Sequence, residues 1–364
     1  MAEDSPVTKP CVADEGRTGQ EASAGGALLH GGDLDGARAV FPGAPEPWVD
    51  LSTGINPWPY PLPPVRPDAW NRLPGRGEEA ALRDAAAACY GAPSAELVAA
   101  ASGSQALIQL LPRLRAPGRV AVLGPTYAEH ARCWALAGHE VRMVEEVEEV
   151  DVLVIVNPNN PDGRRWPAAR LLEMADVQAA RGGWLVVDEA FADMRPEDSL
   201  AAHAGKPGLV ILRSFGKFFG LAGLRLGIAL APAGLAAALR EAFGPWAVSG
   251  PGLAIATAAL GDRHWIGATR RRLAAAAAEL DRMLEGAGLR VVGGTELFRL
   301  VEDPRAPALY RALGEAGILV RRFEGRADWL RFGLPDAAED WQRLGVALAV
   351  ERRRALQPRE TSAS

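Results

Sequence analysis

Short apolar runs alternate with helical stretches through the middle of the chain. The segment EEAALRDAAAACYG has the spacing of an amphipathic helix and ends at Gly91, a residue type common at helix C-termini. Five apolar runs then have the length of buried strands: VAVLG from Val120, VLVIV from Val152, WLVVD from Trp184, LVILRS from Leu209 and LGIAL from Leu226. Strands that alternate with helices predict an α/β fold, with a mostly parallel sheet covered on both faces.

After Pro251 the pattern becomes that of a smaller α/β unit. An Ala- and Arg-rich helix is expected at about 264–286 and a second helix near 307–316. The strands expected around them are RVVGG, LFRLVE, ILVRRF and LRFGL. We therefore predict a large domain over residues 66–250 and a small C-terminal α/β domain over residues 251–354.

The two ends of the chain lack this periodicity. Residues 1–27 and 355–364 are rich in polar and small residues, and we expect both to be disordered tails. Between the first tail and the large domain, residues 28–65 are rich in Gly and Pro. This composition favours an irregular N-terminal arm over a domain with its own core.

Composition limits the classes of partner. Hydrophobic residues make up 48% of the 364, and the net charge of -5 is spread along the chain without a basic block, so we expect no nucleic-acid partner. No apolar run approaches the ~20 residues of a membrane helix, and the first residues lack the apolar core of a secretory signal. The three cysteines form no CxxC pair and the histidines show no metal-ligand spacing. We expect a cytoplasmic protein without a metal ion.

Lysine is rare, and one lysine has unusual surroundings. The 40 basic residues include only three lysines, Lys9, Lys206 and Lys217, and the other 37 are arginine. Lys9 lies in the polar tail and Lys206 in a GKPG turn, whereas Lys217 lies among glycines and apolar residues in SFGKFFGLAGLRLG. An amine can lose its proton and condense with an aldehyde, which a guanidinium cannot do. Lys217 is therefore the candidate for covalent chemistry.

Three turns carry candidate binding residues, each with a plain structural alternative. Ser104 opens a helix after a Gly-Ser turn, where it could seat a phosphate or simply cap the helix. Tyr127 in GPTYAEH follows a strand, where its ring could stack on a pyridine or pack in the core. Asn160 in VNPNNPDG could hydrogen-bond a phenolate oxygen or belong to an ordinary turn.

Two later segments complete the pattern. Asp188 ends the apolar strand WLVVD, where a carboxylate is costly unless it has a partner such as a pyridinium N–H. Ser214 and Arg225 lie on either side of Lys217 within twelve residues and could hold a phosphate. The structural alternative is a lysine buried without a partner, which proteins rarely contain.

Together these segments resemble the pattern of fold-type-I pyridoxal-phosphate (PLP) transferases, specifically the branch that is similar to histidinol-phosphate aminotransferases. The resemblance covers about residues 28–350, and Asp188 precedes Lys217 by 29 residues, close to the family spacing. It implies a homodimer and a small-molecule substrate, with PLP held by Lys217 as a Schiff base. It also implies a role for each matching residue: Asp188 at the pyridine nitrogen, Asn160 at O3′, Tyr127 on the ring, Ser104, Gln105, Ser214 and Arg225 at the phosphate, and Arg331 at the substrate carboxylate.

Two positions depart from the family pattern. Where many members have a tyrosine three residues after the aspartate, this chain has Phe191. Where many have a tyrosine in an N-R-Y-P segment that reaches the partner subunit's phosphate, this chain has Leu73 in NRLPG. Neither change removes the lysine, the aspartate or the arginines that the chemistry requires.

The N-terminal arm is similar to that of threonine-phosphate decarboxylases of cobalamin biosynthesis. Those enzymes begin with an HGG segment and have a later S-x-x-INP segment, which match HGGDLDGA at 30–37 and LSTGINPWPYP at 51–61. The resemblance implies decarboxylation of L-threonine O-3-phosphate to (R)-1-amino-2-propanol O-2-phosphate and carbon dioxide. The residues it assigns to the substrate are His30, Gly54, Asn56, Arg321 and Arg331.

Two other functions stay open at this point. An aminotransferase acting on a phosphorylated substrate such as histidinol phosphate would use the same residues. The outcome depends on which bond at the substrate Cα stands perpendicular to the PLP ring, which a sequence does not specify. A non-catalytic PLP-binding or regulatory domain would fit better if Lys217 or Asp188 were missing.

Overall fold

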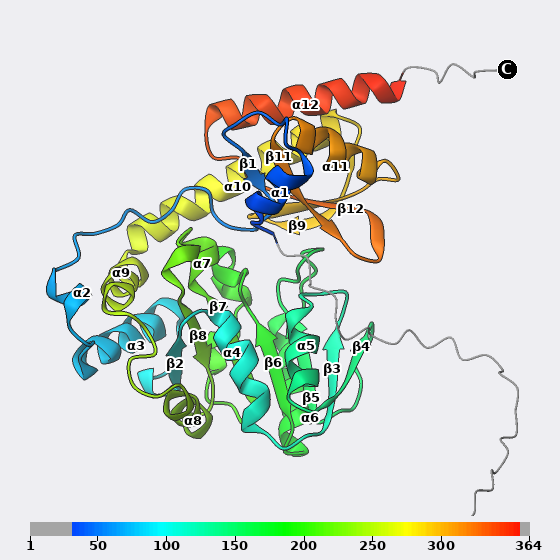
Figure 1. Ribbon diagram of the computed structural model, residues 1–364. Helices are drawn as coiled ribbons and strands as arrows, with labels where there is room; N and C mark the ends of the chain where they lie inside the picture. The colour runs from blue at the N-terminus through cyan, green and yellow to red at the C-terminus, as the bar shows by residue number, and fades with distance from the viewer. Residues whose placement is uncertain (1–30, 357–364) are drawn as a thin grey trace, which may run out of the picture.

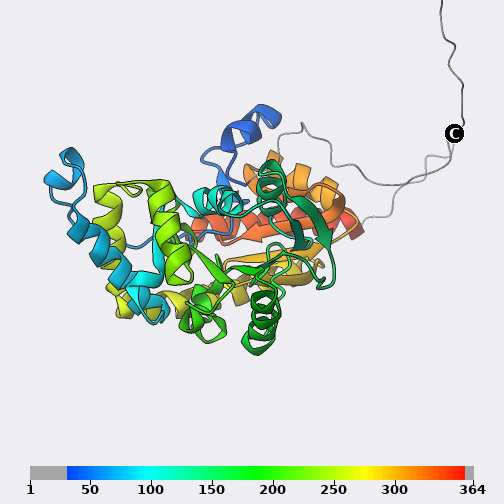
Figure 2. The ribbon, with the colours of Figure 1, turned by 90° about the horizontal axis from the view of Figure 1, so that it is seen from below.

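The computed structural model describes residues 31–356, which form a large domain, a small domain and an arm that runs along both (Figure 1). His30 and most of the two predicted tails lie outside these residues. A view turned by 90° shows α1 (Leu34–Val40) and α2 (Asp68–Asn71) well apart on the outside of the molecule (Figure 2). The arm between these helices therefore spans from the small domain to the large one.

The large domain is built on a seven-stranded sheet with the order β2-β8-β7-β6-β5-β3-β4. β8 pairs antiparallel with both of its neighbours, and the other pairs are parallel, as the sequence predicts for a mostly parallel sheet. The strands are β2 (Val98–Ala101), β3 (Arg119–Leu123), β4 (Glu140–Val144), β5 (Val152–Val156), β6 (Trp184–Asp188), β7 (Leu209–Ser214) and β8 (Gly227–Leu230). Its α-helices are α3 (Arg76–Tyr90), α4 (Ser104–Leu110), α5 (Glu129–Leu136), α6 (Ala168–Ala180), α7 (Phe215–Phe218), α8 (Ala233–Phe243) and α9 (Gly250–Gly261).

The central strands are apolar throughout because both faces of the sheet are covered. In β5, Val152 and Val154 pack in one core cluster with Leu107 of α4, while Leu153 packs in a second cluster with Leu171 of α6. Successive side chains of a strand point to opposite faces, so a strand with two covered faces needs apolar residues at every position. This explains why the runs predicted from the sequence show no alternation.

The small domain has a five-stranded sheet with the order β1-β11-β12-β10-β9. The C-terminal part of the chain supplies β9 (Arg290–Thr295), β10 (Phe298–Glu302), β11 (Ile318–Phe323) and β12 (Arg326–Gly333), all antiparallel to their neighbours in this group. The arm supplies β1 (Val49–Leu51), which pairs parallel with β11. The helices of this domain are α10 (Arg263–Gly286), α11 (Ala306–Glu315) and α12 (Ala338–Leu356).

Short 3₁₀ helices lie in the connections: η1 (Ala95–Leu97), η2 (Leu111–Leu114), η3 (Ala192–Met194), η4 (Pro196–Asp198), η5 (Ala201–His203) and η6 (Ala222–Leu224). Within residues 31–356, no helix has both the length and the apolar character that crossing a membrane requires.

Candidate functional site

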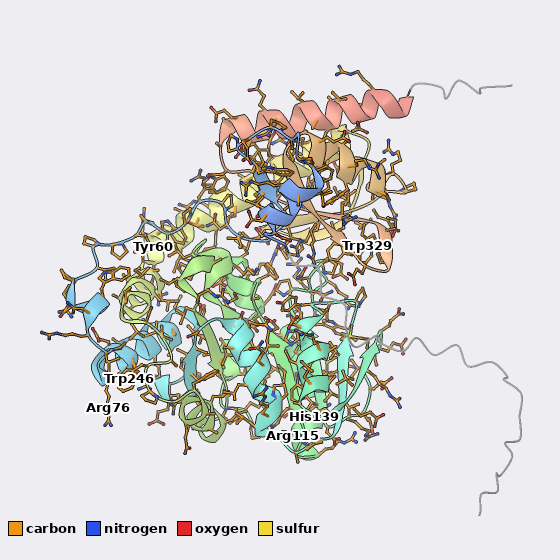
Figure 3. The ribbon with its side chains drawn as sticks, in the orientation of Figure 1. Tyr60, Arg76, Arg115, His139, Trp246 and Trp329 are labelled. Atoms are coloured by element: carbon orange, nitrogen blue, oxygen red, sulfur yellow. The ribbon has the colours of Figure 1, made fainter. Side chains whose placement is uncertain are left out.

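A cavity of about 440 Å³ lies where the carboxyl ends of the large-domain strands face the small domain. Open α/β sheets place ligands at such ends. Trp329 of β12 lines the cavity, and Figure 3 shows it on the side of the small domain that faces the large one. Ten of the residues predicted from the sequence line this one cavity: Ser104, Gln105, Tyr127, Asn160, Asp188, Ser214, Lys217, Arg225, Arg321 and Arg331.

Lys217 lies in α7, the short helix that directly follows β7. Burial, together with the positive charge of Arg331, lowers the pKa of its amine from 10.5 to about 8, whereas Asp188 opposes the shift. The Nζ atom lies 5.8 Å from the centroid of the Phe191 ring. A lysine with this pKa has a substantial neutral fraction near neutral pH, which is the form that attacks a carbonyl carbon.

Asp188 is buried at the carboxyl end of β6, and its carboxylate has two hydrogen-bond donors. His130 Nε2 lies 2.8 Å from Oδ2, and the Ala190 backbone N–H donates to Oδ1 at 3.0 Å. His130 is only 1% exposed, so the pair is shielded from solvent. An ionised carboxylate can accept about four hydrogen bonds, so Asp188 keeps capacity for a further donor in the cavity.

A chain of hydrogen bonds fixes the side chain of Tyr127. Its hydroxyl donates to Gln105 Oε1 at 3.1 Å, and Gln105 Nε2 donates to Glu129 Oε2 at 2.9 Å. Glu129 is buried at the start of α5 and is also 3.3 Å from Arg132 Nη1. Burial raises the pKa of Tyr127 to about 12, with a further contribution from the negative charge of Glu129, so the phenol stays neutral.

Ser104, Ser214 and Arg225 meet at one end of the cavity because of the strand register. Gly227 at the start of β8 pairs with Ser214 of β7 on one side and with Ala101 of β2 on the other. Ser104 follows β2, and Arg225 lies two residues before Gly227. Two hydroxyls and an exposed guanidinium therefore come from adjacent stretches of backbone and line the same cavity, which is a suitable donor set for a phosphate.

Arg331 and Arg321 extend the cavity into the small domain. They are cross-strand partners in β12 and β11, so both side chains lie on the same face of that sheet. Arg331 donates through Nη1 to Asn160 Oδ1 and through Nη2 to the Ser52 carbonyl at 2.7 Å. Its buried Nε–H has no hydrogen-bond partner within residues 31–356. Two neighbouring cations, one of them with an Nε–H that can still donate a hydrogen bond, favour an anionic ligand.

The remaining predicted substrate residues are placed differently. Asn56 does not line the cavity: its Nδ2 donates to the Phe218 carbonyl at 2.8 Å, and its backbone N–H donates to the Lys217 carbonyl at 2.9 Å. Gly54 also lies off the cavity, against the rings of Phe298 and Phe191. The predicted residue His30 falls outside the described residues, and the residue that follows it, Gly31, lines the cavity.

The two residues that depart from the family pattern differ in burial. Phe191 is buried and packs edge-on against Phe298, with ring centroids 5.0 Å apart. It therefore offers the cavity a ring face and no hydroxyl. Leu73 is 68% exposed in this single chain and has no part in the cavity.

Sequence reasoning missed His130 and Glu129. Both lie in the GPTYAEH segment that also contains Tyr127. His130, at the start of α5, follows Tyr127 by three residues, and the two rings pack edge-on with centroids 6.0 Å apart. That spacing was the available signal, although a histidine on a helix face is more often an ordinary core residue.

The sheet, the cavity and the buried lysine together define a protein of the PLP-dependent aminotransferase type. The chain belongs to the aminotransferase class I and II family, whose model matches residues 67–344. It is 49% identical over 327 residues to the threonine-phosphate decarboxylase of Pseudomonas aeruginosa, covering 88% of this chain and 97% of that protein. A threonine-phosphate decarboxylase of a Sinorhizobium species is also 49% identical, covering 88% of this chain and 98% of its own.

A solved structure has the same fold at lower identity. The histidinol-phosphate aminotransferase from Sinorhizobium meliloti, solved in complex with pyridoxal 5′-phosphate, superposes with a TM-score of 0.72. It is 22% identical in sequence, and the match covers 89% of this chain and 95% of that one.

Proposed function

We propose that this chain is a PLP-dependent carboxy-lyase that converts L-threonine O-3-phosphate to (R)-1-amino-2-propanol O-2-phosphate and carbon dioxide, a step of cobalamin biosynthesis. The observation that carries the proposal is the pair of cations Arg321 and Arg331 in one cavity with the amine of Lys217, in a chain 49% identical to threonine-phosphate decarboxylases. A substrate with both a carboxylate and a phosphate needs two such cations.

The residues of the cavity fit PLP. The amine of Lys217, with its lowered pKa, would hold the cofactor's aldehyde carbon. Asp188 would accept a hydrogen bond from the pyridinium N–H, and Tyr127 would lie against the ring. Ser104, Ser214 and Arg225 would hold the phosphate. When bound, PLP withdraws electrons from the substrate Cα, which lets a bond to that carbon break.

The other residues control the position and the protons of the substrate. Arg331 holds the carboxylate that leaves as carbon dioxide, and Arg321 holds the phosphate at the opposite end. Two anchors at opposite ends of the substrate would restrict rotation about the bond between its nitrogen and Cα, and this rotation decides whether the carboxylate or the hydrogen is lost. The amine of Lys217 would be placed to return a proton to Cα. Asp188, held in place by its contact with His130, would face the ring nitrogen.

The test is product release without an amino acceptor. Threonine phosphate alone should release carbon dioxide through many turnovers, because decarboxylation leaves the cofactor unchanged after each cycle. An aminotransferase would stop after one half-reaction until a 2-oxo acid was added. Sustained turnover only in the presence of 2-oxoglutarate would contradict the proposal.

Two arginine variants provide a second test of the same proposal. Arg321→Ala should raise the KM for threonine phosphate by about tenfold or more, because a charge-assisted hydrogen bond contributes roughly 1.5–3 kcal/mol. Its effect on unphosphorylated threonine should be small. Arg331→Ala should weaken the binding of both threonine phosphate and threonine, since both have the carboxylate. Equal losses for both substrates in Arg321→Ala would move the phosphate site elsewhere in the cavity.

The proposal includes a homodimer in the cytoplasm. Trp70 in α2 and Leu73 just after it are 70% and 68% exposed, which is unusual for large apolar side chains that no partner covers. The described cysteines, Cys89 and Cys133, are both free thiols, which suits a reducing compartment.

A further inference from the structure

The two domains meet at a contact between backbones. The loop 157–165, which follows β5 in the large domain, lies against β9 of the small domain. The Gly294 N–H donates to the Asp162 carbonyl at 2.9 Å. A Cβ atom on Gly293 would lie 2.0 Å from the Asp162 oxygen, and one on Gly163 would lie 1.9 Å from the Gly294 oxygen. Only glycine fits at these two positions.

The loop cannot yield to such an atom, because Asn159 holds it in place. The Asn159 side chain is only 2% exposed and makes three hydrogen bonds. It accepts from Thr126 Oγ1 at 2.6 Å and donates to the Pro125 carbonyl at 2.9 Å. It also donates to Asp162 Oδ1 at 2.8 Å, which fixes the residue that contacts β9. Movement of Asp162 would break its hydrogen bond to Asn159, which the other two bonds hold in position.

The Gly293 side of this contact lies in the same cross-strand row of residues as Arg331. In the small-domain sheet Gly293 pairs with Leu300, and Leu300 pairs with Arg331. Arg331 therefore lies two strands away from the contact, about 10 Å at the usual strand spacing. The loop also reaches Arg331 directly, since Asn160 Oδ1 accepts from Arg331 Nη1. One loop thus touches both ends of a single row of residues across the sheet.

We propose that Gly293 and Gly163 are positioning residues, and that their contact sets the distance between Arg331 and the cofactor-binding half of the cavity. The inference rests on the proposed role of Arg331 in binding the substrate carboxylate. A larger residue at either position pushes β9 away from the loop. The sheet then moves as a unit, so Arg331 moves away from Asn160 and from Lys217.

The test is Gly293→Ala, with Gly286→Ala as its matched control. Gly293 has no positive φ, so alanine there adds only a methyl group to the contact. Gly286 lies at the end of α10 in the same domain, where an added methyl carbon would have no atom of another segment of residues 31–356 within 4 Å. Displacement of a binding group by about 1 Å can cost on the order of a hundredfold in rate, and we expect kcat/KM for threonine phosphate to fall by about that factor in Gly293→Ala. Gly286→Ala should match the parent.

A second readout separates positioning from general damage. PLP content and borohydride labelling of Lys217 should be unchanged in Gly293→Ala, because the residues that would hold the cofactor lie in the large domain. The affinity for threonine phosphate, followed by the change in cofactor absorbance, should fall. In an Arg331→Ala background, Gly293→Ala should cause no further loss of affinity, because residues that act through one another are not additive. An equal loss in both backgrounds, or no loss in either, would overturn the inference.

A milder variant covers the case in which Gly293→Ala does not fold. Arg195 lies 3.3 Å from Glu296 across the same junction, and Arg195→Ala removes this ion pair without adding atoms. A smaller loss of affinity that disappears in the Arg331→Ala background supports the inference, and unchanged affinity contradicts it. If the parent binds threonine phosphate but releases no carbon dioxide, the proposed reaction fails while these affinity measurements still test the positioning role.

Discussion

At the scale of single residues, burial of Lys217 makes its amine more reactive. Its amine has a pKa of about 8, so the neutral fraction increases steeply as the pH approaches that value. The rate at which the cofactor-free protein takes up PLP should rise by about tenfold for each pH unit below 8 and then level off. Stopped-flow absorbance measures this rate, and Lys217→Ala should give no borohydride-stable product.

The prediction would be contradicted if the rate of PLP uptake continued to rise with pH up to the ordinary lysine pKa of 10.5. That would mean that burial and Arg331 do not lower the pKa of Lys217. Arg331→Ala provides a further check, since it removes a positive charge that disfavours the protonated amine. The plateau should then begin at a higher pH.

Sequence and structure differ in what they reveal about individual side chains. Lys217 and Asp188 were predictable because a charged group in an apolar run is costly to bury unless it has a partner. His130 and Glu129 were not, because their roles depend on partners 58 and 24 residues away, Asp188 and Gln105. The position of Asn56 against the Phe218 carbonyl likewise joins segments 162 residues apart.

At the scale of elements, the arm holds α7 in place. Asn56 is 1% exposed and hydrogen-bonds the carbonyl of Phe218 in α7. Asn56→Ala should lower the free energy of unfolding by about 1–3 kcal/mol, because it leaves a buried carbonyl without a donor. Urea unfolding measures this loss. Because α7 carries Lys217, PLP should also bind more weakly to the variant.

Asn56→Asp is the matched comparison for that prediction. It keeps the size of the side chain but replaces the amide donor with a carboxylate, so it should be at least as destabilising as alanine. If the alanine variant unfolds at the same urea concentration as the parent, the arm does not hold α7.

The elements themselves were predictable where their apolar residues form a buried run or recur at helical or strand spacing. The apolar runs at β3, β5, β6, β7 and β8 are confirmed, as are α3, α10, α11 and the strands β9 to β12. β4 was missed because its sequence, EVRMV, is mostly exposed, and β2 because VAAA lacks the bulky residues typical of strands. β1 has only three residues, and it exists because β11 offers it a partner.

At the scale of the whole molecule, the exposed apolar residues beside α2 predict the oligomeric state. Trp246, which is 50% exposed, lies at the same end of the large domain as Arg76 of α3 (Figure 3). The segment that follows Trp246 packs on α2, since a Cβ on Gly250 would lie 2.3 Å from the Ala69 carbonyl oxygen. This contact links the segment that carries Trp246 to the helix that carries Trp70.

Charged substitutions test this surface. Trp70→Asp with Leu73→Asp should convert a dimer to a monomer in light scattering, because a charge is costly in a buried apolar interface. Val177→Asp is the control: Val177 is 53% exposed, and its helix α6 lies well away from α2 (Figure 1). A parent protein that is monomeric and fully active at micromolar concentration would contradict the dimer.

The pairing of β1 with β11 has a consequence for how this chain can be divided. The small domain is not a continuous piece of sequence, because its sheet needs Val49–Leu51 from the arm. A polypeptide of residues 251–356 alone would expose the unpaired N–H and C=O groups of β11 along the rim of the sheet. Such an open strand pairs readily with other chains. We therefore expect that fragment to aggregate, and to become soluble when a peptide containing residues 44–56 is added in trans.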